Sequence, residues 1–159
     1  MIHIPAAKRI VRAFEFSPEL SAILLRKDGS FRDYGVISRL LVTDAGVAFL
    51  TDAFQNLTEI EAMNFHASGT GVAAEAVTDT TLGTEVASRV AGTQSEPASN
   101  QYRTVATIPY SGSFAITEHG IFSAASAGTL WDRSVFSVIN VVSGDSIQFT
   151  YTLTINSGG

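Results

Sequence analysis

The chain has 159 residues, about the length of one domain, with 45% hydrophobic residues, 16% charged residues, no cysteine and a formal net charge of −5. The missing cysteines exclude a disulfide framework, a cysteine-based zinc site and a thiol nucleophile. No apolar run approaches the roughly 18 residues of a membrane span, and the first residues lack the pattern of a secretory signal. We therefore expect a soluble protein that is made in the cytoplasm and does not contact a membrane.

The charge is unevenly distributed along the chain. Residues 1–39 hold seven cations and four acids, whereas residues 40–159 hold three cations and eleven acids. This asymmetry predicts two parts, a basic N-terminal arm (residues 1–40) and an acidic β-rich body (residues 41–159). The acidic body argues against nucleic-acid binding.

Short apolar clusters alternate with charges in the arm and show no sustained period. Ser17, Pro18 and Glu19 favour the start of a short helix, and residues 27–30 favour a turn. Because arginine is enriched at protein interfaces, the mixture of arginines and aromatic residues predicts docking onto an acidic protein surface. A solvated face whose arginine stems cover apolar surface is the alternative. The candidate partner-binding residues are Lys8, Arg9, Arg12, Phe14, Phe16, Arg26 and Arg32.

One helix is predicted at the start of the body, over residues 43–55. Thr43 can cap it, Val47, Leu50 and Phe54 form an apolar stripe, and Asn56 suits the left-handed conformation after a helix end.

From residue 59 onward the apolar period changes to two, the period of a β-strand. Residues 72–84 read as an ordered connection, and residues 94–97 as a turn. The predicted strands begin with one from residue 59 to about residue 67 and continue at 85–92, 101–109, 113–123, 129–140 and 146–155. The predicted fold is mainly β, an antiparallel β-sandwich or jelly-roll-like body with one N-terminal-side α-helix and an extended N-terminal arm.

The sequence carries no convincing catalytic, cofactor or metal site. His119 follows Glu118, but lone histidines are more often structural, and no nucleophile elbow is present. Glu59 and Glu61 resemble a solvated strand edge more than a catalytic pair. Residues 69–71 lack the lysine and the helix of a phosphate loop. We therefore expect a protein that is not an enzyme and needs no cofactor.

Eight stretches of residues 33–147 resemble, in order and spacing, virion structural proteins of tailed bacteriophages. They are DYGVIS at 33–38, VTDAGVAFL at 42–50, DAFQN at 52–56, FHASGTG at 65–71, TDTTL at 78–82, AITEHGIF at 115–122, WDRSVFSVIN at 131–140 and SGDSI at 143–147. The resemblance does not cover residues 1–32 and carries no catalytic residue over.

The resemblance implies a head decoration (cement) protein on the capsid exterior. Its expected partners are the major capsid protein and itself, as a homotrimer. Such a protein stabilises the assembled shell by mass action and requires no chemistry. The alternative is a tail or fibre-associated virion protein that binds host glycans, with Trp131 and Tyr102 as stacking residues, although both aromatic positions also suit a core.

Overall fold

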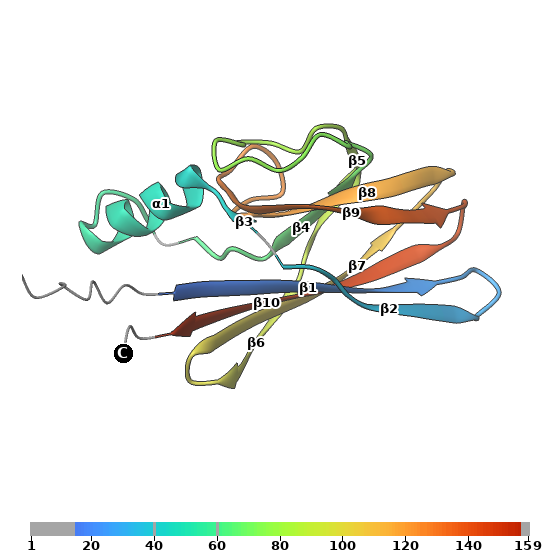
Figure 1. The fold of residues 1–159 in the computed structure, drawn as a ribbon, viewed down its shortest axis with the longest axis horizontal. Helices are drawn as coiled ribbons and strands as arrows, with labels where there is room; N and C mark the ends of the chain where they lie inside the picture. The colour runs from blue at the N-terminus through green and yellow to red at the C-terminus, as the bar shows by residue number, and fades with distance from the viewer. Residues whose placement is uncertain (1–14, 40, 60, 157–159) are drawn as a thin grey trace, which may run out of the picture.

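Two five-stranded antiparallel sheets form a β-sandwich in the computed structural model, which describes residues 15–39, 41–59 and 61–156 (Figure 1). The first sheet has the strand order β2-β1-β10-β7-β6, and the second has the order β3-β9-β8-β4-β5. The first sheet contains β2 (Phe31–Ser38), β1 (Glu15–Leu25), β10 (Ser146–Asn156), β7 (Gln101–Pro109) and β6 (Thr93–Ala98). The second contains β3 (Leu41–Val42), β9 (Leu130–Val141), β8 (Phe114–Phe122), β4 (Phe65–Gly69) and β5 (Glu85–Ala91). The prediction of a mainly β sandwich with one helix is confirmed.

The core lies between the sheets and follows from the period-two pattern. Ile147, Phe149, Tyr151 and Leu153 of β10 are buried, and the residues between them are half-buried. Because side chains alternate across a strand, this pattern places one whole face of β10 in the core. The facing sheet contributes the buried side chains Ile116, Ile121, Trp131, Phe136 and Ile139.

The arm boundary that we predicted at residue 40 does not match the sandwich. Residues 15–25 and 31–38 form β1 and β2, and β1 lies between β2 and β10 in the first sheet. The predicted helix start at Ser17 is wrong, because these residues pair with β10 in a continuous register. Pro18 fits this strand because β2 joins β1 only from Leu20 onward, so Pro18 lies where β1 has an open side. Residues 1–14 lie outside the described residues.

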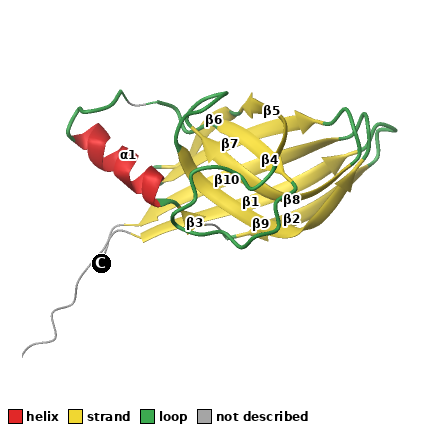
Figure 2. Ribbon diagram, turned by 90° about the horizontal axis from the view of Figure 1, so that it is seen from above, coloured by secondary structure: helices red, strands yellow, loops and turns green. Residues whose placement is uncertain are grey.

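Helix α1 (Asp44–Phe54) confirms the predicted helix and both of its ends. The Thr43 side chain accepts a hydrogen bond from the Gly46 N–H at 3.1 Å, and Asn56 has a left-handed φ of 56°. Gly46 packs against Trp131 so closely that a Cβ would come within 2.8 Å of the indole ring. This contact fixes the first turn of α1 on the sandwich. The rest of the helix projects beyond the strands, at the end where β1 begins and β10 ends (Figures 1 and 2).

Two of the segments predicted between the helix and β7 differ from the structure in detail. The strand predicted from residue 59 begins at Phe65, and the turn predicted at 94–97 is part of β6. The chain passes from the second sheet to the first at Gly92, whose N–H donates to the Asn64 carbonyl at 2.7 Å. Residues 72–84 form an ordered connection, as predicted, and Leu82 from this connection packs with Phe122 and Leu130 in a small second core.

Candidate functional site

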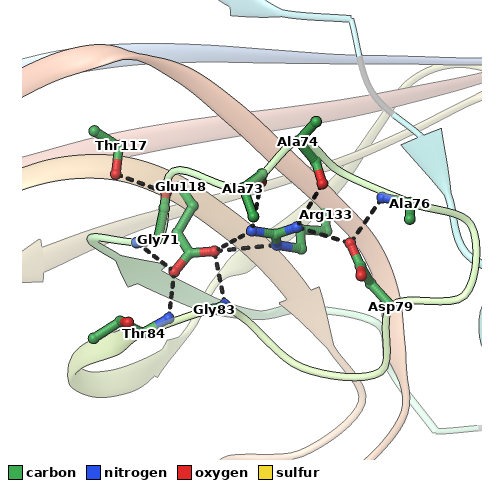
Figure 3. Close-up of polar contacts among 10 residues, drawn as sticks. All are labelled: Gly71, Ala73, Ala74, Ala76, Asp79, Gly83, Thr84, Thr117, Glu118 and Arg133. Atoms are coloured by element: carbon green, nitrogen blue, oxygen red, sulfur yellow. Dashed lines mark hydrogen bonds and ion pairs between the residues drawn. The ribbon is translucent and has the colours of Figure 1, made fainter.

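A buried ion network links the connection between β4 and β5 to the two central strands of the second sheet (Figure 3). The Glu118 side chain on β8 is fully buried, and the Arg133 guanidinium on β9 donates to Glu118 Oε2 from Nη2 at 2.8 Å and from Nε at 3.1 Å. Arg133 Nη1 also donates to Asp79 at 2.8 Å. The register places Glu118 and Arg133 on the same face of their neighbouring strands.

Backbone amides of the connection complete the coordination of the Glu118 carboxylate. Oε1 accepts from the N–H groups of Gly71 at 2.9 Å and Thr84 at 2.7 Å, and Oε2 accepts from Gly83 at 2.9 Å. Burial alone would raise the pKa of Glu118, but these amides and the guanidinium of Arg133 outweigh it and lower the pKa. The carboxylate is therefore ionised and fully hydrogen-bonded, so the geometry suits a structural anchor better than proton transfer.

Two glycines make room for this anchor. A Cβ at Gly69 or Gly71 would collide with the Glu118 carboxylate, and at Gly69 it would also collide with the Thr84 carbonyl. Residues 69–71, which superficially resemble a phosphate loop, thus leave space for a carboxylate of the same chain.

A second polar cluster, a pair of histidines, lies in the core between the sheets. His66 Nδ1 and His119 Nε2 are 3.0 Å apart, and His66 Nε2 lies 3.1 Å from the Thr104 hydroxyl. Burial lowers the pKa of His66 to about 3. The pKa of His119 is held well below its usual value, mainly by burial and to a lesser extent by repulsion between the positive charges of the two rings. Both rings are therefore neutral at physiological pH. Glu118 lies on the opposite face of β8 from His119, so the two residues do not form a catalytic dyad.

Asp132, a third buried polar residue, lies beside the hydroxyl of Tyr151. Asp132 is 2% exposed, and its Oδ2 atom has no hydrogen-bond partner. Burial, together with the charge of Glu75, raises the pKa of Asp132 well above its usual value. The Tyr151 hydroxyl accepts a hydrogen bond from the Trp131 indole at 2.7 Å, so Trp131 is tied into the same interior cluster.

We expect the substitution Asp132→Asn to increase the stability of the protein at about pH 8, since it removes a carboxylate that is costly to ionise. The gain should be about 1.4 kcal/mol for each unit by which folding raises the Asp132 pKa. Linkage gives the sign of this effect. A carboxyl group whose pKa is higher in the folded protein than in the unfolded chain stabilises the folded protein at low pH, and this stabilisation is lost as the pH rises. Urea unfolding of the unaltered chain and of Asp132→Asn, at about pH 8 and about pH 5, measures the gain in stability. A gain that is as large at about pH 5 as at about pH 8 would contradict the raised pKa of Asp132.

Several of the eight stretches named in the sequence analysis meet in these buried contacts. Gly71, Asp79, Glu118 and Arg133 come from four of the eight stretches and form one network. Thr43 and Gly46 belong to another stretch and hold the helix against Trp131. In the stretch 143–147, Asp145 accepts from the N–H groups of Lys27 and Val142. These residues therefore hold the sandwich together.

An apolar pocket of about 300 Å³ opens at the end of the sandwich that carries α1. Its lining comes from α1, from the segment before β4, from the inner face of the first sheet and from the start of β9. The main lining residues are Phe16, Leu50, Met63, Tyr102, Trp131 and Ile155.

The apolar stripe of α1 continues from this pocket into solvent. Leu50 lines the pocket, while Phe54, one turn further along, is 89% exposed and Val47 is 49% exposed. Leu57, just after the helix, is 71% exposed. Val47, Leu50, Phe54 and Leu57 together are called the α1 face below. The sequence predicted this stripe, but most of it does not pack on the body.

The seven predicted partner-binding residues are not gathered into one surface among the residues that the structure describes. Phe16 is half-buried and contacts Trp131 edge-on, with ring centroids 6.2 Å apart. Arg26 lies at the other end of β1 and pairs with Asp145 at 3.1 Å, and Arg32 lies over the Tyr34 ring. The remaining four, Lys8, Arg9, Arg12 and Phe14, lie outside the described residues.

Sequence reasoning missed the anchor and the pocket. One signal for the anchor was available, because Glu118 and Arg133 are charged residues within mostly apolar strands, and a buried charge needs a partner. The pocket had no such signal, since its walls come from segments far apart in the sequence. Trp131 is 4% exposed, which agrees with a core position and leaves little surface for stacking on a sugar.

No family model, curated protein or solved structure matches the chain. Within the described residues, no helix is long and apolar enough to cross a membrane. The same part of the chain contains no cluster of three or more histidine, aspartate or glutamate side chains that could hold a metal ion.

Proposed function

We propose that the chain is a structural protein of a tailed-bacteriophage virion, a head decoration (cement) protein that binds the assembled capsid. The observation that carries a binding role is the α1 face, because Phe54 and Leu57 are largely exposed beside an apolar pocket. Exposed apolar patches next to a pocket mark interaction sites in soluble proteins. The resemblance of the eight stretches supplies the virion context.

The sheet edges support this use of the α1 end. The edge strands are β2 and β6 in the first sheet and β3 and β5 in the second. The pairing of β2, β5 and β6 with their neighbours is interrupted by register shifts, and β3 has only two residues. Pro97 lies within β6. Short or interrupted edges discourage strand addition, so association through the α1 end or through residues 1–14 is favoured.

A decoration protein of this kind needs a rigid body and a contact that exists only on the assembled shell. The anchored sandwich provides the body. Binding only the assembled shell shifts the equilibrium towards assembly, and several contacts made by one oligomer strengthen the attachment. The partners in this proposal are the major capsid protein and further copies of the chain, as a homotrimer.

Removal of residues 1–14 should leave a folded body that no longer sediments with expanded heads of the phage that encodes it. The cut belongs before Glu15, because β1 begins there and Phe16 packs on Trp131. Circular dichroism checks the fold, and co-sedimentation measures binding. The expected result is an affinity for heads that is weaker by about tenfold or more, and a tenfold change in Kd corresponds to about 1.4 kcal/mol.

The matched control is the substitution Lys27→Ala, which removes an exposed cation in the turn between β1 and β2. Lys27→Ala should bind heads like the unaltered chain. If the shortened chain still binds with unchanged affinity, residues 1–14 have no part in attachment. If the full chain does not bind heads and instead retains host glycans, the tail or fibre function replaces the proposed one.

A further inference from the structure

The α1 face is an apolar surface with an acidic surround. Asp52 and Glu59 are exposed beside Phe54 and Leu57 in the chain, and Glu61 lines the pocket. No lysine or arginine occurs between residues 40 and 88. A ligand that covers this surface must therefore combine apolar side chains with positive charge.

The N-terminal segment, residues 1–14, has this composition. It contains three cations and no acid, together with five large apolar residues besides Met1. The cations are Lys8, Arg9 and Arg12, and the apolar residues are Ile2, Ile4, Ile10, Val11 and Phe14. Fully extended, 14 residues span up to about 46 to 50 Å.

The geometry of β1 indicates which copy supplies the segment. Glu15 pairs with Asn156, so β1 remains in register with β10 up to its first described residue and delivers the chain at the end of the sandwich. The pocket extends from Phe16 over Ile155 of β10 towards Tyr102 of β7, on the side of β1 away from β2. A chain that left β1 at Glu15 would have to reverse at once to fill it, whereas a segment from another copy needs no reversal.

We propose that the N-terminal segment of one copy binds the α1 face and its pocket on a second copy. The contact joins two different surfaces, so repeating it around an axis gives a ring when the rotation between copies closes. It would bury the apolar side chains of both surfaces and pair the cations of the segment with Asp52 and Glu59. This inference goes beyond the proposed function and can be tested on the purified chain without capsids.

Cysteine cross-linking tests the contact directly, because the chain has no cysteine of its own. One variant carries Ala13→Cys, and another carries Leu57→Cys at an exposed position. Mixing the two under mild oxidation should give a disulfide-linked dimer between unlike variants, identified by peptide mass spectrometry. A third variant, Ser143→Cys, is the control, since Ser143 is exposed in the turn between β9 and β10, and it should give no such dimer with Ala13→Cys.

Charge exchange in the same cysteine variants provides a second readout that alters no further apolar side chain. Arg9→Glu with Arg12→Glu should slow the cross-linking about tenfold, and Asp52→Lys with Glu59→Lys on the other variant should restore it. If the chain with both cysteines closes on itself and the mixture gives no dimer, the segment binds its own body and the proposal is wrong. If neither the chain with both cysteines nor the mixture of variants forms the disulfide, the proposal is also wrong. The proposed function would still stand if the unaltered chain binds capsids.

Discussion

Replacing Glu118 with glutamine is expected to lower the free energy of unfolding by about 3–5 kcal/mol. The variant keeps the shape of the side chain but leaves the buried Arg133 guanidinium with Asp79 as its only charged partner. It also replaces one carboxylate oxygen with an NH₂ group, which donates and does not accept. That group faces either the N–H of Gly83 or the N–H groups of Gly71 and Thr84, which then lose their acceptor. Both changes leave buried polar groups without partners, which is the costly case.

Urea unfolding followed by the fluorescence of Trp131, the single tryptophan, measures this change. The control is Arg39→Ala, which breaks the exposed pair between Arg39 and Glu19 and should cost less than about 1 kcal/mol. Equal effects of the two substitutions would show that the network is not an anchor.

Acid is expected to destabilise the protein well above the pH at which carboxylates titrate. His66 and His119 are neutral in the folded state, because burial lowers their pKa values, but both bind protons near pH 6.5 when unfolded. The folded state therefore binds fewer protons, so stability is fully present above about pH 6.5 and is lost as the pH falls towards the folded values. Between about pH 7.5 and about pH 5, the loss should be about 2 kcal/mol for each ring, or about 4 kcal/mol together.

Asp132 acts in the opposite direction and must be removed to see the full effect. Its raised pKa means that the folded state takes up a proton as the pH falls, which offsets part of the loss from the histidines. The measurement therefore uses Asp132→Asn, with urea unfolding at both pH values. If the free energy of unfolding of Asp132→Asn is the same at the two pH values, the rings of His66 and His119 are not buried as neutral groups.

The strands of the body and the helix could be predicted because their signals are local. The period of two identifies β10 from its own residues, and Thr43 and Asn56 mark the two ends of α1. The strand β1 was missed because Ile23, Leu24 and Leu25 are all apolar and hide the alternation, while Pro18 suggests a helix start. The strand β6 was missed because all six of its side chains are exposed and Pro97 resembles a turn residue.

The buried anchor and the α1 face depend on contacts between distant residues. Glu118 and Arg133 meet because β8 and β9 pair with a register shift between them, and a sequence pattern does not specify such a shift. The stripe of α1 predicts a helix with one apolar side, but it does not indicate that Phe54 projects beyond the sandwich. Which apolar stripe packs on the body and which remains available for a partner is decided by the tertiary structure.

The proposal of a head decoration protein is best tested by cryo-electron microscopy of virions assembled from the genome that carries this gene. We expect sandwich-shaped density on the outer surface of the expanded head, with copies arranged around local threefold positions. The end that carries α1 should lie against a neighbouring copy. Density for the chain in the tail or its fibres, or none on the particle, would contradict the assignment to the head.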